Sequence, residues 1–318
     1  MRHEAVSSAP ANLAGSGGRT EMLRQKALRA LNSLPPFSPV LNRLLASLAE
    51  ENVSFAKLAD LIEKDTVVAA NLLHLVNSAA YARRGTVSSV RHALSVLGTN
   101  KLRNAVLGMS VARMWTHTNI PSAWSMARFN MHSAAVAILS DLLVQRLSVE
   151  YPEGAFVAGL LHDTGRLLIA MGLPSEHDQI AALHNRELIP LVECEARVLG
   201  FTHPDLSLRA LQFWNLPEPI QVAAAGHHPP PAPNPAGLNA DLAALRHSLS
   251  GGGVLSLGGV IAAANQFVNS TGVSISPEPA SPCGDPAPLE ALGLDETAQE
   301  ELLTEFKTEF DAMSPFFR

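Results

Sequence analysis

Residues 154–173 read GAFVAGLLHDTGRLLIAMGL, and this stretch decides the fold of the chain. An adjacent His162-Asp163 pair stands inside a segment that is otherwise apolar and that we expect to form a hydrophobic helix. Ionisable groups are costly to bury unless they are paired or bind a metal ion. Three interpretations of the pair stay open: a metal site, the remnant of a metal site, or a polar pair that fixes helix packing.

Helical periodicity continues on both sides of this stretch. Leu41, Leu44 and Leu45 recur at helical spacing, and Ser38-Pro39 just before them is typical of an N-cap and first helical turn. Alternation with a period of two residues, typical of strands, is nearly absent. We therefore predict an all-α fold made of two packed helical subdomains. Later helices are expected over about 123–147, 175–188, 190–199, 204–214, 218–226, 238–249, 254–268 and 296–313.

Changes in composition suggest the domain organisation. Residues 1–20 are rich in Ser, Ala and Gly, and we expect them to be disordered. The helical pattern then divides into a first subdomain over about 23–118 and a second over about 122–235, followed by an extension over 236–318. The prolines of residues 229–235 predict an extended spacer.

Composition also excludes several classes of function. The chain has 318 residues, 47% of them hydrophobic, and a net charge of −6. An acidic balance argues against a nucleic-acid partner, because phosphate contacts need clustered Lys and Arg. The two cysteines, Cys194 and Cys283, form no CxxC pair, which argues against a zinc knuckle or a disulfide scaffold. With no signal peptide and no apolar run of the ~20 residues that span a bilayer, we expect a cytoplasmic protein without a membrane partner.

A series of short segments follows one another in a specific order. The series comprises Leu34-Pro35-Pro36-Phe37, Asn77-Ser78-Ala79-Ala80-Tyr81, Val87-Ser88-Ser89-Val90, Gly159-Leu160-Leu161-His162-Asp163-Thr164-Gly165-Arg166-Leu167, Gly200-Phe201-Thr202-His203, Phe213-Trp214-Asn215-Leu216-Pro217 and His227-His228. Over about residues 30–230 this series resembles the HDOD family, the HD-related output domains of bacterial signalling proteins. The resemblance implies a non-enzymatic regulatory module that acts on signalling proteins in trans or responds to a small ligand such as a nucleotide. It also implies that 236–318 completes an HD-like core.

The second half is also similar to catalytic HD phosphohydrolases, which suggests an alternative function. Those enzymes hold divalent metal ions with a His, an adjacent His-Asp pair and a distant Asp, and the metal lowers the pKa of bound water. Here His132 matches the first His, and His162 and Asp163 match the pair. The position expected for the distant Asp reads Asn265. The resemblance thus implies a vestigial metal site, and we expect no catalytic residue, no resident cofactor and no efficient turnover of a nucleotide or cyclic dinucleotide.

The remaining polar residues near the pair have structural interpretations. We expect His132 to be a buried partner of Asp163, and Arg166 to pair with the same carboxylate from three residues away. Arg166, His203 and Asn265 together form the predicted structural polar cluster. His227-His228 is interpreted as the end of a helix, where imidazolium favours the negative end of the dipole. The C-terminal phenylalanines, among them Phe317, either pack on the core or form a contact surface.

Overall fold

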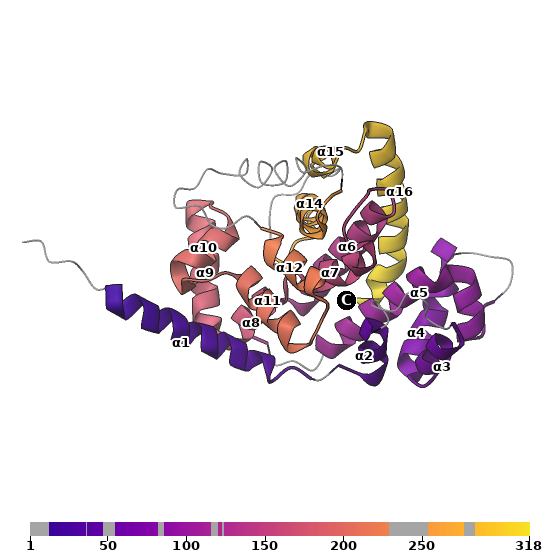
Figure 1. Ribbon diagram of the computed structural model, residues 1–318, viewed down its shortest axis with the longest axis horizontal. Helices are drawn as coiled ribbons and strands as arrows, with labels where there is room; N and C mark the ends of the chain where they lie inside the picture. Colours follow the sequence, from indigo (N-terminus) through magenta and orange to yellow (C-terminus); the bar gives the residue numbers. More distant parts are fainter. Residues whose placement is uncertain are drawn as a thin grey trace, which may run out of the picture.

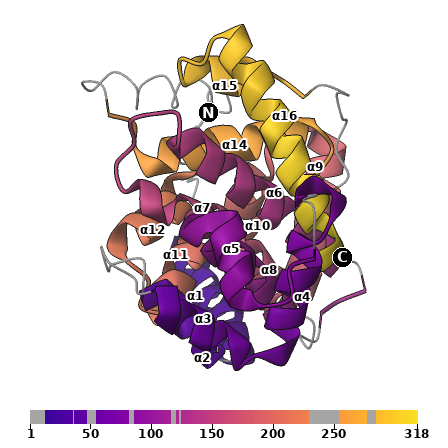
Figure 2. The same ribbon diagram turned by 90° about the vertical axis from the view of Figure 1, so that its right-hand side faces the viewer.

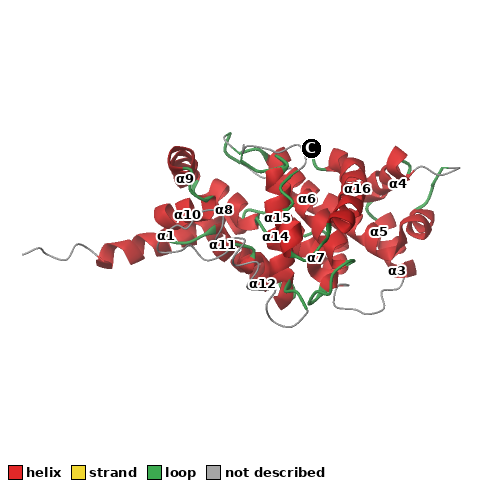
Figure 3. Cartoon of the chain, turned by 90° about the horizontal axis from the view of Figure 1, so that it is seen from above, coloured by secondary structure: helices red, strands yellow, loops and turns green. Residues whose placement is uncertain are grey.

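Helices alone build the described part of the chain. The computed structural model describes residues 13–35, 37–46, 55–81, 86–115, 120–122, 124–228, 254–276 and 284–318. Over these ranges there is no β-strand, only an isolated bridge between Val149 and Leu255 (Figure 3). The predicted all-α fold is confirmed. The expected spacer at 229–235 and the expected helix at 238–249 lie outside the described residues.

The first helices mostly begin where the sequence predicts caps. The helices of this part are α1 (Leu13–Leu31), α2 (Pro39–Ala46), α3 (Phe55–Glu63), α4 (Thr66–Val76) and α5 (Val90–Trp115), with a 3-10 turn η2 (Ala79–Tyr81) before α5. Ser38 Oγ accepts the N–H of Leu41 at 3.1 Å at the start of α2. Gly98, with φ of 76°, interrupts α5 at a conformation that suits glycine.

Helix α1 differs from the sequence prediction in two ways. It begins at Leu13, inside the segment 1–20 that we expected to be disordered; residues 1–12 lie outside the described range. It also packs mainly on α8, α10 and α11 of the second half (Figure 1). The cause is a close backbone contact: a Cβ on Gly172 of α8 would lie 2.8 Å from Cα of Ala27. Residues 23–31 therefore contact the HD-like half, although the sequence groups them with the first subdomain.

The second half surrounds α6. Its helices are α6 (Met126–Val144), α7 (Ala155–Leu161), α8 (Thr164–Gly172), α9 (Pro174–Glu187), α10 (Leu191–Leu199), α11 (His203–Phe213), α12 (Glu218–Gly226), α14 (Leu257–Ser270), α15 (Ala287–Ala291) and α16 (Glu296–Met313), with 3-10 turns η3 (Pro152–Gly154) and η4 (Ser314–Phe316). Helix α6 packs on α7, α14 and α16, and α12 packs on α7, α11 and α14. Figure 2 shows α16 running along α6.

One continuous hydrophobic core joins the two halves. Tryptophan rings lie where the two halves meet. The ring centroid of Trp115 of α5 is 6.2 Å from those of Trp214 and Phe129. Among the described residues no single helix is long and apolar enough to cross a bilayer. Only the segments Pro152–Gly172 and Pro174–Glu187, bent by 116° at their junction, meet that criterion when taken together.

Candidate metal centre

The His162-Asp163 pair lies at a break between two helices. The sequence predicted that it lies inside one helix, and this prediction is wrong. Helix α7 ends at Leu161 and α8 begins at Thr164. In a continuous helix the His162 carbonyl would accept the N–H of Arg166. Instead, the Arg166 N–H binds the carbonyl of Asp163 at 2.9 Å. The hydroxyl of Ser207 donates to the His162 carbonyl at 2.6 Å and accepts the N–H of Gly165 at 2.9 Å.

Helix α11 causes this break by lying against the start of α8. A Cβ on Gly165 would lie 2.0 Å from the carbonyl oxygen of His203, so only glycine fits there. The glycine thus lets α11 bring both Ser207 and His203 up to the pair. The periodicity of the apolar residues carries no information on this contact, and for this reason the sequence predicted one uninterrupted helix.

The imidazoles converge on the two oxygens of Asp163. Nε2 of His132 and Nε2 of His162 lie 3.7 and 3.6 Å from Oδ2 of Asp163. Nε2 of His203 and Nε2 of His227 lie 3.1 and 3.5 Å from Oδ1. All five residues are at most 1% exposed. The carboxylate of Asp163 therefore lies between two pairs of ring nitrogens that come from α6, the α7–α8 junction, α11 and the end of α12.

The other nitrogen of each ring is held by an outer acceptor. In three of the rings Nδ1 donates to a backbone carbonyl. Nδ1 of His132 donates to the carbonyl of Val273 at 2.8 Å, that of His162 to Gly159 at 2.7 Å, and that of His227 to Ala224 at 2.7 Å. Because a carbonyl can only accept, each of these Nδ1 atoms carries a proton, and each Nε2 is turned toward the cluster. This arrangement is the one that metal-ligating histidines adopt.

His203 has a different outer acceptor. Its Nδ1 donates to Oε2 of Glu195 at 2.7 Å, and its backbone N–H donates to the same carboxylate at 2.7 Å. Burial would lower the pKa of His203, but the carboxylates of Glu195 and Asp163 raise it to about 9. In the metal-free protein His203 is therefore an imidazolium between two carboxylates.

Three buried atoms of the cluster have no hydrogen-bond partner among the described residues: Nε2 of His132, Nε2 of His162 and Oδ1 of Asp163. Nε2 of His203 is close to Oδ1, but its hydrogen bond is with Nε2 of His227 at 3.3 Å. Burial lowers the pKa of His162 to about 3 and also lowers the pKa of His132, so both rings are neutral. Burial alone would raise the pKa of Asp163, but the positive charges of Arg166 and His203 hold this pKa well below its usual range. Neutral lone pairs thus face an ionised carboxylate, and a cation between them would satisfy all these atoms.

These residues form two overlapping sets of metal ligands. His132, His162 and Asp163 make one set, and Asp163, His203, His227 and His228 make the other, with ligand atoms within 4.8 Å of one another in each. Imidazole and carboxylate ligands suit ions such as Zn²⁺, Fe²⁺ or Mn²⁺. The residues present therefore fit a divalent transition-metal ion, and the carboxylate shared by the sets could bridge two.

The structure brings most of the predicted site residues together, but it does not join Asn265 to them by a hydrogen bond among the described residues. The expected pairs of Asp163 with Arg166 and with His132 are present, at 3.3 and 3.7 Å. His203, which the sequence placed in a structural polar cluster, lies beside Asp163, with its Nε2 3.1 Å from Oδ1. Asn265 is 2% exposed, but its Oδ1 accepts from Asn269 at 3.0 Å, and no hydrogen bond in the described residues joins it to the histidines or to Asp163. Its place in the structural polar cluster stays a prediction.

Sequence reasoning missed two parts of the cluster. His227 and His228 were interpreted as helix-end imidazoles, whereas His227 lies 3.5 Å from Asp163. A His-His pair that follows an ordered His-Asp and His series is a signal that could have grouped them with the ligands. Glu195 has no such signal, because it is one acid among several on the amphipathic helix α10.

The family profile of the HDOD domain matches residues 34–230. The chain belongs to the HDOD family. The HDOD fold extends beyond the profile, because solved structures match almost the whole chain. An HDOD domain protein of unknown function from Geobacter sulfurreducens is 21% identical, with a TM-score of 0.67 over 93% of this chain and 97% of that one.

Two further HDOD-like structures carry provisional functional names. A protein from Marinobacter aquaeolei VT8, named provisionally as a signal transduction protein, is 21% identical with a TM-score of 0.64, over 94% of this chain and 66% of that one. A protein from Shewanella amazonensis SB2B, named provisionally as a phosphohydrolase, is 21% identical with a TM-score of 0.67, over 92% of this chain and 98% of that one. At this identity the likeness establishes the fold.

A curated relative is longer than this HDOD chain. An uncharacterized protein of Treponema pallidum (strain Nichols) is 21% identical over 212 residues, which are 66% of this chain. The chain spans 40% of that relative's length.

Proposed function

We propose that this HDOD protein is a regulatory module whose HD-like half holds a divalent transition-metal ion and whose output passes to signalling proteins in trans or depends on a small ligand. One observation carries the proposal: neutral Nε2 lone pairs of His132 and His162 face the ionised Asp163 with no proton between them. A purely structural polar pair, which the sequence favoured, would leave these buried atoms unsatisfied at a cost of about 1–3 kcal/mol each.

Each residue would have a defined role toward the ion. His132, His162 and Asp163 would bind it directly, and the carbonyls of Val273 and Gly159 hold the two rings in the required tautomer. Glu195 orients His203, and Arg166 balances the negative charge of Asp163. When bound, such an ion could polarise a ligand atom or lower the pKa of a water molecule.

Two features favour regulation over turnover. The ligand side chains are buried, with exposures of at most 1% for those nearest to Asp163, so a phosphoester has no open path to them in this conformation. Residue 265, where the resemblance expects a carboxylate, is an amide. The family and the provisional name of the Marinobacter structure support a role in signalling.

Metal content and thermal stability test the proposal. The purified protein is expected to retain close to one equivalent of a transition metal, and chelation should lower its melting temperature by several degrees. A site-specific ligand at 100 times its Kd stabilises the fold by about 2.7 kcal/mol. His132→Gln should lose most of the metal, whereas His92→Ala, at an exposed position of α5, should keep it. A fold with native helicity and no metal after incubation with Zn²⁺, Mn²⁺ and Fe²⁺ would contradict the proposal.

A metal-dependent phosphohydrolase is the second candidate, and the shared carboxylate favours it. The two oxygens of Asp163 face separate ligand sets, an arrangement that could place two ions side by side as two-metal hydrolases do. Hydrolysis of a generic phosphodiester with Mn²⁺ that Asp163→Asn abolishes would establish this activity. If the sequence assignment of residue 265 is right, Asn265→Asp should raise the metal affinity.

A further inference from the structure

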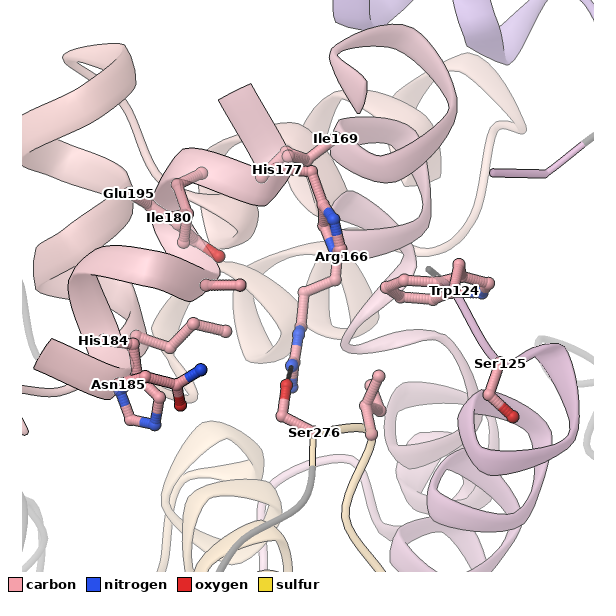
Figure 4. A pocket seen from close by; sticks show the side chains of 13 residues that line it. Trp124, Ser125, Arg166, Ile169, His177, Ile180, His184, Asn185, Glu195 and Ser276 are labelled. Atoms are coloured by element: carbon pink, nitrogen blue, oxygen red, sulfur yellow. Dashed lines mark hydrogen bonds between the residues drawn. The ribbon is translucent and has the colours of Figure 1, made fainter. Parts of the chain in front are cut away.

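A small cavity lies next to the metal-ligand cluster, on the side of Arg166 and Glu195. It has a volume of about 150 Å³, is partly open to solvent, and lies between α8, α9 and α10 and the residues at 124–125 and 275–276. Figure 4 shows Trp124 on one side of it, His184 and Asn185 on the other, and Arg166 between them. A cavity of about 150 Å³ holds one benzene ring, whereas pockets for drug-sized ligands have about 300–1,000 Å³. The volume admits one small molecule and is too small for the nucleotide that the sequence suggested.

Most of the cavity wall is apolar. Ile169, Ile180, Ala181 and Leu191 line it together with the ring of Trp124, and both isoleucines are at most 3% exposed. Such a wall favours an apolar body by about 25 cal/mol per Å² of apolar surface removed from water. A bare inorganic anion would gain nothing from it.

Two histidine side chains, His177 and His184, stand among these apolar residues. Burial lowers the pKa of His177, so its ring is neutral, and its Nδ1 has no hydrogen-bond partner among the described residues. The nearest carboxylate, that of Asp178, is 3.6 Å away, beyond hydrogen-bond distance. His184, which also lines the cavity, donates from Nδ1 to the carbonyl of Ile189 at 2.7 Å.

Arg166 supplies the positive charge of the cavity. Its guanidinium carries five N–H donors, and the described residues accept from two of its nitrogens: Asp163 Oδ2 at 3.3 Å and Ser276 Oγ at 3.1 Å. Its side chain is 12% exposed and lines the cavity. Donors therefore remain for a carboxylate, the group whose planar geometry matches a guanidinium.

We propose that this cavity binds a small organic monocarboxylate, with the carboxylate on Arg166 and the apolar body between the Trp124 ring and Ile180. The inference rests on the proposed regulatory function, in that this acid would be the small ligand of the module. Arg166 also pairs with Asp163, so a carboxylate on the guanidinium binds the cation that balances the charge of the residue shared by both ligand sets. The bound acid could thereby change the charge balance of the metal-ligand cluster.

Calorimetric titration with benzoate as the probe tests this site. Benzoate should bind at least about tenfold more tightly than benzamide, which lacks the charge, and than acetate or inorganic phosphate, which lack the apolar body. Equal affinity for benzamide would show that Arg166 does not recognise charge, and equal affinity for phosphate would show that the walls do not contribute. Either result, or no benzoate binding at millimolar concentration, overturns the proposal.

A matched pair of variants on α9 locates the ligand. Ala181 lines the cavity, and its neighbour Ala182 is exposed and does not. Ala181→Leu should fill the cavity and weaken benzoate at least about tenfold, whereas Ala182→Leu should leave the affinity unchanged. Helicity and melting temperature of both variants report their folding, and unchanged benzoate binding by a folded Ala181→Leu overturns the proposal. Metal content measured on the same samples tests the proposed function separately, because benzoate can bind whether or not the ion is retained.

Discussion

A single hydroxyl group holds the break that positions the His162-Asp163 pair. Ser207 is fully buried, and it donates to the carbonyl of His162 and accepts from the N–H of Gly165. These are the two backbone groups that the break between α7 and α8 would otherwise leave unpaired. At the scale of the residue, the metal-ligand cluster therefore depends on a side chain that is not one of its ligands.

Replacing this hydroxyl should be costly. Ser207→Ala leaves a buried donor and a buried acceptor unpaired, which should lower the free energy of unfolding by about 1–3 kcal/mol. Urea denaturation of the metal-free protein measures this loss without the contribution of an ion. Ser175→Ala, on the exposed side of α9, should change stability by less than about 0.5 kcal/mol. Equal stability of the two variants would show that the hydroxyl does not hold the break.

At the scale of the element, glycines set how closely the helices approach. Gly165 lets the backbone of α11 approach the start of α8. A Cβ atom at position 165 would lie only 2.0 Å from the carbonyl oxygen of His203. Gly258 of α14 faces α12 less tightly, because a Cβ there would be 3.6 Å from Cα of Ala223. The contact at Gly258 is therefore one of ordinary van der Waals distance.

Alanine at the two glycines should have opposite effects. Gly165→Ala forces backbone against backbone and should cost about 3 kcal/mol or more, because neither chain can move away without breaking the Ser207 contacts. Gly258→Ala adds an ordinary contact and gains helix propensity, so it should be neutral or stabilising by up to about 1 kcal/mol. Thermal unfolding followed by circular dichroism measures both. A stable Gly165→Ala protein would mean that α11 and α8 lie further apart.

At the scale of the whole molecule, the C-terminal segment ties the two halves together. Helix α16 lies on α6, where Glu305 pairs with Arg146 at 2.7 Å and with Lys101 of α5 at 3.3 Å. Such half-exposed ion pairs stabilise a protein by about 0–1 kcal/mol each. The apolar contact of Phe317 should contribute more to stability than these ion pairs. Phe317 is 1% exposed, and its ring lies so close to Gly108 of α5 that a Cβ at position 108 would be 2.8 Å from it.

The terminal phenylalanines should therefore differ in their contribution. Phe317→Ala empties a buried position between the halves and should lower the free energy of unfolding by about 3–5 kcal/mol. Phe316 is only partly buried, with its ring edge on His74, and Phe316→Ala should cost clearly less. Chemical denaturation of the two variants compares them directly. If both losses are small, the C-terminal segment does not hold α5, and the phenylalanines would be the contact surface that the sequence left open.

The sequence by itself determined the helices and the family. Helical hydrogen bonds join residues four apart, so apolar periodicity and caps such as Ser38 predict helices from local information. Helix α16 has the predicted bounds. The ordered motifs likewise indicated the family and the His162-Asp163 pair. Only the tertiary structure decided that the pair lies at a helix break, that α1 packs on the second half, and that His227 and Glu195 belong to the cluster. These features depend on distances between helices far apart in the chain, which no local pattern of residues encodes.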